Sequence, residues 1–397
     1  MKSKQKIIYI GNKKIVCDVK LEEYKEETII KKVTAIDNYL KEYGYNDEDI
    51  EKISNQFPGV YTYSIQNINN KLNELEELGF SKKETIEMTS SFPGLFSYDN
   101  EKIKQKHKYL ETLGYKKSEI LKMIKKFPQI YGISIASIIK KQKDLILEKY
   151  TLEEIIKMTK TAPQLYGKTI ENIKEKIEFF KKLGYTQQEI IKITKELPTL
   201  YSLDKETILE KITELEEIGF SKKQIIKIIK SNPHICALSK KNITSKTNEI
   251  MALGYKKEEF IKMIVVFPKL YTYSLENIEE KISELFSLGF TKEEILNITK
   301  ELPALYGLNI ETIKEKIDFY DSINLRQILI EEPKNLMQSV GLSKARYYFY
   351  QEIGLEIDET NYRKLFIAQK RFEKKYNLTK QDLINKYKEE KEYVRVL

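Results

Sequence analysis

The sequence of 397 residues has no tryptophan, two cysteines and two histidines, and these scarcities exclude several kinds of site. Cys17 and Cys236 are too few for a disulfide framework, and they cannot form a zinc site alone. Two cysteines suit a reducing compartment. His107 and His234 are interpreted as local variants within a repeat and not as ligands. We therefore expect no metal site and no cofactor.

Long apolar runs are also missing. No run approaches the roughly 18 residues of a membrane span, so we expect no membrane insertion. The start, MKSKQKIIYIGNKKIVCDVK, has an apolar run too short for a signal peptide and lacks arginine. It predicts a β-hairpin of KIIYI and IVCDV around a GNKK turn. We expect a cytoplasmic protein, and an organelle matrix stays open.

Proline is scarce too, and its positions reveal the organisation of the chain. The first eight prolines are 35 residues apart, and the ninth follows after 30: Pro58, Pro93, Pro128, Pro163, Pro198, Pro233, Pro268, Pro303 and Pro333. A fixed period of this length is typical of a solenoid, in which each repeat packs only on its neighbours.

Each period predicts two helices. A good N-cap residue stands six positions after each proline: Ser64, Asp99, Ser134, Thr169, Asp204, Ser239, Ser274 and Asn309. Isoleucine stands ten positions after it, at residues 68, 103, 138, 173, 208, 243, 278 and 313, and begins an apolar stripe. Glycine ends this helix in most repeats, although Lys149 takes its place once. A shorter helix follows, opened by capping boxes such as Ser81 with Glu84, and it stops at the next proline.

These signals predict an all-α superhelical solenoid of about eight 35-residue two-helix repeats. Three segments are expected: a basic N-terminal hairpin over 1–20, the repeat array over 21–340, and a helical cap or appended domain over 341–397. Within the last segment Ser343 is predicted to cap a helix that ends at Ile353.

One lysine recurs without exception, thirteen residues after each of the first eight prolines. The eight residues are Lys71, Lys106, Lys141, Lys176, Lys211, Lys246, Lys281 and Lys316. At 100° per residue the lysine lies about 60° from the isoleucine, at the border of the apolar stripe. Two interpretations stay open and are compatible: an aliphatic stem that covers the core, or one phosphate-facing charge per repeat.

The short helices carry two further lysine registers. The first contains Lys122, Lys157, Lys192, Lys227 and Lys262, and the second contains Lys125, Lys160, Lys195, Lys230 and Lys300. The two registers are three residues apart and so share one helix face. An ordinary solvated face explains them as well as a nucleic-acid surface does. The long helices are richer in acidic residues, which favours a basic surface opposite an acidic one.

The net charge of +9 sits at the two ends of the chain, since residues 21–340 are formally neutral. Attraction for a polyanion must then come from charge segregation and from the ends. All five arginines lie at or beyond residue 326, so residues 1–325 lack the side chain that reads guanine with two hydrogen bonds. Lysine rows therefore suit phosphate contacts better than base readout.

Three motifs recur in phase over residues 44–325: LGF(S/T)xxEI, then P-x-L-Y, then S-x-x-x-I-x-x-K-I-x-x-L. In these motifs the chain resembles the mTERF family of mitochondrial transcription termination factor-like helical repeat proteins, and specifically a bacterial-type member. The resemblance implies a curved superhelix with a basic concave face that binds double-stranded DNA or, in some members, RNA. It also implies a role in transcription or gene expression.

The function expected is therefore that of a monomeric nucleic-acid-binding protein, with DNA preferred over RNA. The candidate binding residues are the eight recurrent lysines together with Lys122, Lys157, Lys192, Lys195, Lys227 and Lys230. No nucleophile motif, phosphate-cradling loop or metal-spaced cluster is visible, so an enzyme is not expected. Two alternatives stay open: an RNA-binding factor, and a scaffold that binds a protein partner along its concave face.

Overall fold

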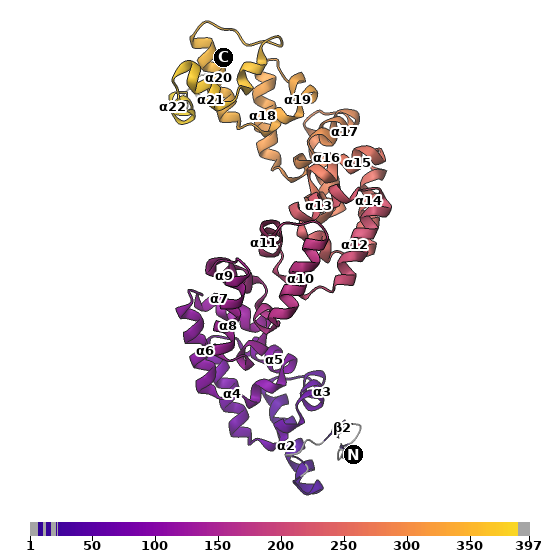
Figure 1. Ribbon diagram of the computed structural model, residues 1–397, viewed down its shortest axis with the longest axis vertical. Helices are drawn as coiled ribbons and strands as arrows, with labels where there is room; N and C mark the ends of the chain where they lie inside the picture. Colours follow the sequence, from indigo (N-terminus) through magenta and orange to yellow (C-terminus); the bar gives the residue numbers. More distant parts are fainter. Residues whose placement is uncertain (1–6, 11–12, 17–20, 22, 388–397) are drawn as a thin grey trace. The chain divides into compact units, whose positions relative to one another are not determined.

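The computed structural model describes residues 7–10, 13–16, 21 and 23–387, and these residues are almost entirely helical (Figure 1). The chain forms two compact units, Met1–Lys205 and Glu206–Leu397, which are described separately. Long helices alternate with short ones, and a 3-10 helix follows each short helix.

The long helices are α2 (Glu26–Tyr43), α4 (Ile65–Leu78), α6 (Asn100–Thr112), α8 (Ile135–Leu147), α10 (Ile170–Lys182), α12 (Lys205–Ile218), α14 (Lys240–Ala252), α16 (Leu275–Ser287), α18 (Ile310–Ser322) and α20 (Val340–Glu352). The short helices are α3 (Asp47–Gln56), α5 (Lys82–Ser91), α7 (Lys117–Lys126), α9 (Leu152–Thr161), α11 (Gln187–Glu196), α13 (Lys222–Ser231), α15 (Lys257–Val266), α17 (Lys292–Glu301) and α19 (Gln327–Glu331). The predicted all-α array of two-helix repeats is confirmed.

Every proline opens a 3-10 helix, where its missing N–H costs nothing. The nine are η1 (Pro58–Thr62), η2 (Pro93–Ser97), η3 (Pro128–Gly132), η4 (Pro163–Gly167), η5 (Pro198–Ser202), η6 (Pro233–Ala237), η7 (Pro268–Thr272), η8 (Pro303–Gly307) and η9 (Pro333–Met337). The long helices then begin at predicted caps: the side chains of Ser64 and Thr169 accept backbone N–H bonds three residues on. Lys149 adopts a left-handed φ of 75° at the place where other repeats carry glycine.

The recurrent isoleucines form the core of the array, as predicted. All eight are at most 1% exposed, with Ile173 and Ile208 fully buried. They lie on the inner face of each long helix, against the short helix and the 3-10 helix of the same and adjacent repeats. The apolar stripe therefore faces inward throughout.

Buried tyrosines connect successive repeats with hydrogen bonds. The hydroxyl of Tyr150 lies 2.6 Å from Thr194 Oγ1 and 2.5 Å from the hydroxyl of Tyr201, both in the next repeat. Tyr115 and Tyr255 make the corresponding contacts. A buried hydroxyl group needs a hydrogen-bond partner, so these contacts stabilise the packing of neighbouring repeats on one another.

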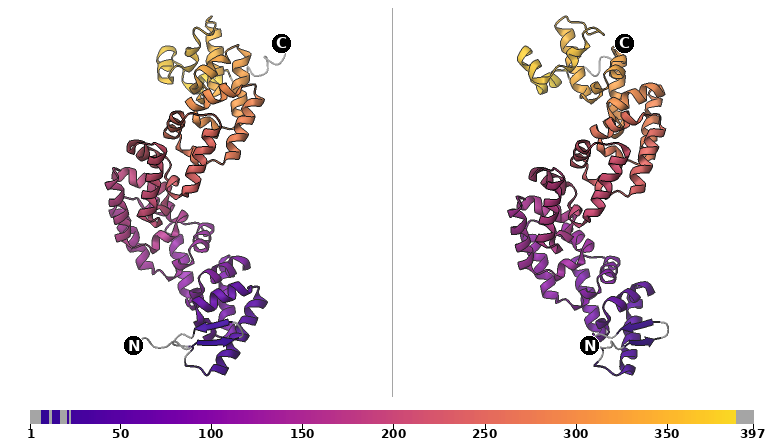
Figure 2. Two further views of the ribbon diagram at one scale, coloured as in Figure 1. Left: turned by 90° about the vertical axis from the view of Figure 1, so that its right-hand side faces the viewer. Right: turned by 45° about the vertical axis from the view of Figure 1, so that its right-hand side comes forward.

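The N-terminal hairpin belongs to the core of the first repeats. Strands β1 (Ile7–Ile10) and β2 (Lys13–Val16) pair antiparallel, with Ile8 opposite Ile15. Both isoleucines are buried and join the apolar cluster of α2 and α3, and Figure 2 shows the strands beside these helices. The predicted hairpin is confirmed, although the predicted turn residues Lys13 and Lys14 belong to β2.

The C-terminal segment continues the repeat in a reduced form. Helix α20 begins at Val340, so the predicted cap at Ser343 is wrong: Ser343 is buried inside the helix and accepts a hydrogen bond from Tyr320. The short helix shrinks from ten residues in α17 to five in α19. After Gly354, with a left-handed φ of 75°, no short helix is seen in the described chain before η10 (Tyr362–Phe366).

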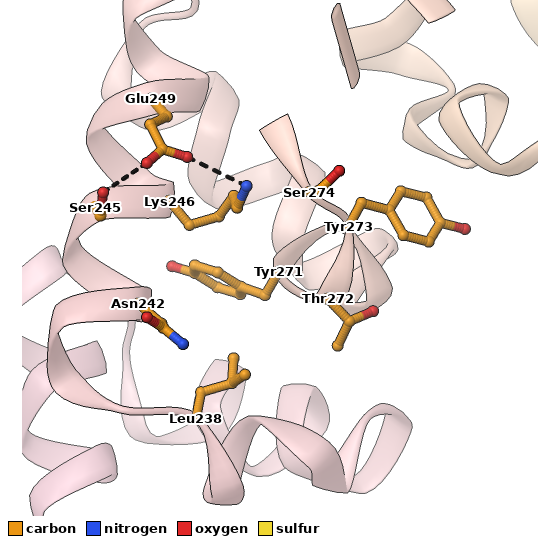
Figure 3. Close-up of a pocket in the computed structure, with 9 residues that line it drawn as sticks. All are labelled: Leu238, Asn242, Ser245, Lys246, Glu249, Tyr271, Thr272, Tyr273 and Ser274. Carbon is orange, nitrogen blue, oxygen red and sulfur yellow. Dashed lines mark hydrogen bonds and ion pairs between the residues drawn. The ribbon is translucent and has the colours of Figure 1, made fainter. Parts of the chain in front are cut away.

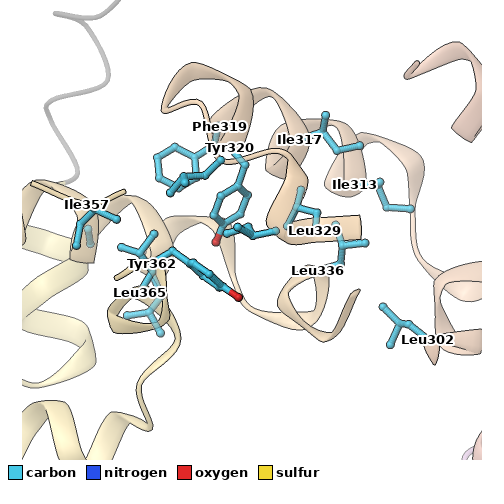
Figure 4. Close-up of a cluster of buried hydrophobic side chains, with 14 of the residues drawn as sticks. Leu302, Ile313, Ile317, Phe319, Tyr320, Leu329, Leu336, Ile357, Tyr362 and Leu365 are labelled. Carbon is cyan, nitrogen blue, oxygen red and sulfur yellow. The ribbon is translucent and has the colours of Figure 1, made fainter. Parts of the chain in front are cut away.

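Two further helices, α21 (Gln369–Tyr376) and α22 (Lys380–Lys386), complete this end of the array. Their side chains share one apolar cluster with the last repeats, in which Tyr320, Leu329 and Leu365 meet (Figure 4). Residues 341–387 therefore pack as a continuation of the core of the second unit.

Candidate nucleic-acid interface

The eight lysines that recur on the long helices are named the buried lysine row. Seven of them are at most 8% exposed, and only Lys246 is half-buried. Their aliphatic stems lie on the inner face of the long helices, beside the recurrent isoleucines. Burial lowers the pKa of Lys71 to about 8, and it also lowers the pKa of Lys106, Lys141 and Lys316.

Six ammonium groups of the buried lysine row bind acceptors of the protein itself. Lys71 Nζ donates to the carbonyl of Tyr98 and to Asn100 Oδ1, both in the following repeat. Lys176 donates to the carbonyl of Leu203 and Lys316 to that of Leu336, and both acceptors also belong to the next repeat. These bonds join α4, α10 and α18 to the ends of the 3-10 helices η2, η5 and η9.

Three other members of the row bind a glutamate one turn further along their own helix. The distances from Nζ to the carboxylate oxygen are 2.8 Å for Lys211 to Glu214, 3.2 Å for Lys246 to Glu249 and 2.5 Å for Lys281 to Glu284. These contacts favour the structural interpretation for six residues, Lys71, Lys176, Lys211, Lys246, Lys281 and Lys316, and Lys106 and Lys141 are buried in the same register. An ammonium group enclosed by the array is poorly placed for a phosphate at the surface.

One register of the short helices also connects repeats. Four of its lysines bind the capping-box glutamate of the preceding short helix, at 2.6 to 3.4 Å, and they are named the paired lysine row: Lys125 with Glu84, Lys160 with Glu119, Lys195 with Glu154, and Lys300 with Glu259. Lys230 occupies the same register on α13. The glutamates hold the helix N-termini as well, so these lysines have a structural partner.

The remaining register is exposed and is named the exposed lysine row. It consists of Lys122, Lys157, Lys192, Lys227 and Lys262. Within the part of the chain that the structure describes, none of the five makes an ion pair or a side-chain hydrogen bond. In the first unit they project from α7, α9 and α11, which pack side by side, and in the second from α13 and α15.

Positive and negative charges are unevenly distributed along the array, although residues 21–340 are neutral in total. Residues 100–168 contain 16 lysines and 7 acidic residues, while residues 21–99 contain 8 lysines and 16 acidic residues. A count in windows of two repeats would have found this contrast in the sequence. Ten lysines of the basic segment are exposed or half-buried and make neither an ion pair nor a side-chain hydrogen bond among the described residues: Lys102, Lys108, Lys116, Lys117, Lys122, Lys140, Lys143, Lys149, Lys157 and Lys168.

His107 and Cys236 are enclosed, whereas His234 is exposed. His107 Nε2 lies 2.6 Å from the hydroxyl of Tyr131, and burial lowers the histidine pKa to about 4. Burial raises the pKa of the Cys236 thiol to about 12, so it stays protonated. Among the described residues no cluster of His, Cys, Asp or Glu could hold a metal ion. None of the described helices has the length and apolar character to cross a membrane.

One pocket, of about 390 Å³, lies between α14 and the η7–α16 turn (Figure 3). Lys246 and Ser245 both bind Glu249 at its wall, and the hydroxyl of Tyr271 lies 3.1 Å from Thr247. The polar groups of these side chains are therefore paired with one another by hydrogen bonds and an ion pair. The pocket marks the repeat in which the buried lysine row is most open.

The fold defines a helical-repeat protein of stacked two-helix units. A family model described as mTERF matches residues 10–158 and 146–373. The chain therefore belongs to the mTERF family, whose members are non-enzymatic, nucleic-acid-binding helical-repeat proteins, and this membership supports a general nucleic-acid-binding role. The comparison with curated proteins found no match.

The family match extends beyond the predicted span of 44–325 at both ends, and the structure explains why. Arg346 stands thirteen residues after Pro333, in the register of the buried lysine row. Its guanidinium is buried and donates to the carbonyl of Leu365 in η10, as Lys316 does to Leu336 in η9. The missing proline and the change from lysine to arginine hid this last repeat from the sequence pattern.

Proposed function

We propose that the protein binds double-stranded DNA through phosphate contacts made by the exposed lysine row. The observation that supports this most directly is that Lys122, Lys157 and Lys192 occur at one register of three adjacent short helices. All three are exposed, and their ammonium groups have no ion-pair partner in the described structure. Lysines held in this way are available to an external polyanion.

The chemistry of the row suits positioning on a backbone. A lysine ammonium acts as a flexible point charge, whereas bidentate base readout needs arginine, and residues 1–325 contain none. Packed helices lie about 8–10 Å apart, which is about three base-pair rises of ~3.4 Å. One lysine per repeat can therefore follow a phosphate backbone with little dependence on sequence.

The proposal is tested by the salt dependence of binding to a labelled DNA duplex, measured by fluorescence anisotropy. In the variant K122Q/K157Q/K192Q three phosphate contacts are removed, and each contributes about −0.9 to the log–log salt slope. The slope should shrink by roughly 2.7. The thermal melt should stay unchanged, because the three side chains are exposed.

A matched control is K125Q/K160Q/K195Q, which removes the same charge from the same three helices. These lysines already bind glutamates of the preceding repeat, so the salt slope should change much less and the melting temperature should fall. Equal slopes for the two variants would contradict a specific role of the exposed lysine row.

We propose a role in transcription or gene expression for this DNA binding. A competition assay with an RNA duplex of the same sequence tests the preference for DNA, since A-form RNA spaces its phosphates differently across its grooves. RNA that displaces the labelled DNA at equal concentration would replace the DNA proposal with an RNA-binding one.

A further inference from the structure

Helix α8 presents an exposed apolar surface on its outer side. Ile146 is 46% exposed and Leu147 is 73% exposed, and Ile139 lies on the same face one heptad before Ile146. On a helical wheel Leu147 lies about 80° from Ile139, with Lys143 between them. Leu152, at the start of α9, is a further exposed apolar side chain. We name Ile139, Ile146 and Leu147 the α8 patch.

The α8 patch departs from the pattern of the adjacent repeats in the first unit. The places of Ile146 and Leu147 hold Glu111 and Thr112 on α6, and Lys181 and Lys182 on α10. A solvated face would carry polar residues here as well. Exposed apolar residues gathered on one helix face commonly mark an interaction site.

Lysines surround the patch. Lys140, Lys143 and Lys149 are exposed on or beside α8, and Lys182 is exposed on α10, which packs against α8. Two acidic residues lie near this end of the helix, Asp144 and Glu148; both are half-buried, and Glu148 lies 3.8 Å from Lys174. The surface thus combines an aliphatic centre with a positively charged rim.

We propose that the α8 patch binds an amphipathic, acidic helix of a protein partner. Aliphatic side chains of such a helix would cover Ile139, Ile146 and Leu147, and its carboxylates would face Lys140, Lys143 and Lys149. This is the helix-against-helix mode of recognition, with hydrophobic anchors in the centre and charge at the rim. The surface is separate from the exposed lysine row, which lies on the short helices.

Two other occupants fit the surface less well. Nucleobases stack on aromatic rings, and the patch has only aliphatic side chains. An anionic membrane needs a broad apolar and basic face, whereas on α6 the place of Ile146 is held by Glu111. An acidic helix matches both the small apolar area and the surrounding charge.

The test uses the full chain and three synthetic 18-residue peptides with a fluorescent label. The first has leucines at i, i+3, i+4 and i+7 spacing with glutamates on its flanks. The second carries lysines in place of the glutamates, and the third is a scrambled acidic sequence. The first peptide should bind at least about tenfold more tightly than the other two, because it alone matches both shape and charge.

The variant I146N/L147Q keeps the charge and removes the two apolar anchors, so it should lose about tenfold in affinity for the first peptide. The matched control is F286N. Phe286 occupies the place of Ile146 in its own repeat and is also 46% exposed, but its helix α16 carries glutamates and not free lysines. F286N should bind the peptide as the unchanged protein does, and all proteins should melt alike.

Equal binding of the scrambled peptide, or unchanged affinity in I146N/L147Q, would overturn the proposal. Co-sedimentation of the protein with anionic phosphatidylserine vesicles tests whether the patch binds a lipid surface instead. A loss of vesicle binding in I146N/L147Q with no peptide binding by the unchanged protein would assign the patch to a lipid surface. The DNA affinity of I146N/L147Q should equal that of the unchanged protein, which separates this proposal from the proposed function.

Discussion

Replacing Lys71 by methionine removes one ammonium group and keeps a side chain of similar length. In the folded protein this group donates to the carbonyl of Tyr98 and to Asn100 Oδ1 in the next repeat, and the residue is 4% exposed. A hydrogen bond to a charged group contributes about 1.5–3 kcal/mol, and an unpaired buried carbonyl costs about 1–3 kcal/mol. Release of the buried charge offsets part of this loss.

We therefore expect K71M to lower the free energy of unfolding by about 1–3 kcal/mol. For a unit of about 200 residues this corresponds to a melting temperature lower by roughly 2–10 °C. The control is K122M, at an exposed lysine without an ion-pair partner in the described structure, which should melt within about 1–2 °C of the unchanged protein. A K71M protein that melts at or above the temperature of the unchanged protein would refute the stabilising role of the buried lysine row.

The same residue predicts a dependence on pH. Burial lowers the pKa of Lys71 from 10.5 to about 8, so between these values the folded protein has released a proton that the unfolded chain still holds. The free energy of unfolding contributed by Lys71 should then rise with pH above about 8. The difference in melting temperature between the unchanged protein and K71M should widen between pH 8 and 9.5, and a constant difference would contradict the pKa shift.

Three other changes test the fold. K149G should raise the free energy of unfolding by about 1 kcal/mol, because φ at this position is 75°; a lower melting temperature would contradict this. Y150F should cost about 1–2 kcal/mol by leaving buried Thr194 and Tyr201 hydroxyls short of a partner, and a neutral melt would show that water replaces the bond. Deleting residues 1–20 should lower the melting temperature by several degrees, since Ile8 and Ile15 belong to the core; an unchanged melt would show that the hairpin is dispensable.

The last of these expectations differs from what the period alone suggests. Because the basic hairpin lies outside the 35-residue repeat, the period alone suggests a positively charged arm that does not pack on the array. Its alternating isoleucines carry the missing signal, since a two-stranded hairpin is stable only when one face packs on something else. Ile8 and Ile15 supply that face.

The architecture could be read from the sequence because its signals are local. A proline, a capping residue such as Ser64, an isoleucine and a glycine act within one helix, and 35-residue repetition confirms each of them several times. Residues 341–387 were harder, since η10 has no proline and Arg346 replaces the lysine. There the recurring signals were Gly354 and the spacing of Arg346 from Pro333.

The role of the buried lysine row could not be read in the same way. A residue about 60° from the core stripe can turn inward or outward, and the choice depends on the neighbouring repeat. The carbonyls of Tyr98 and Leu203 decide it, because they lie within reach of Lys71 and Lys176. No pattern within one helix contains that information.

The most direct test of the division between structural and DNA-binding lysines compares two triple variants on one labelled duplex. One variant is K176Q/K211Q/K246Q, from the buried lysine row, and the other is K122Q/K157Q/K192Q, from the exposed lysine row. We expect the first to keep the salt slope and melt at a lower temperature, and the second to melt normally with a slope smaller by roughly 2.7. A slope that shrinks in the first variant with a normal melt would contradict the account and return the phosphate contacts to the long helices.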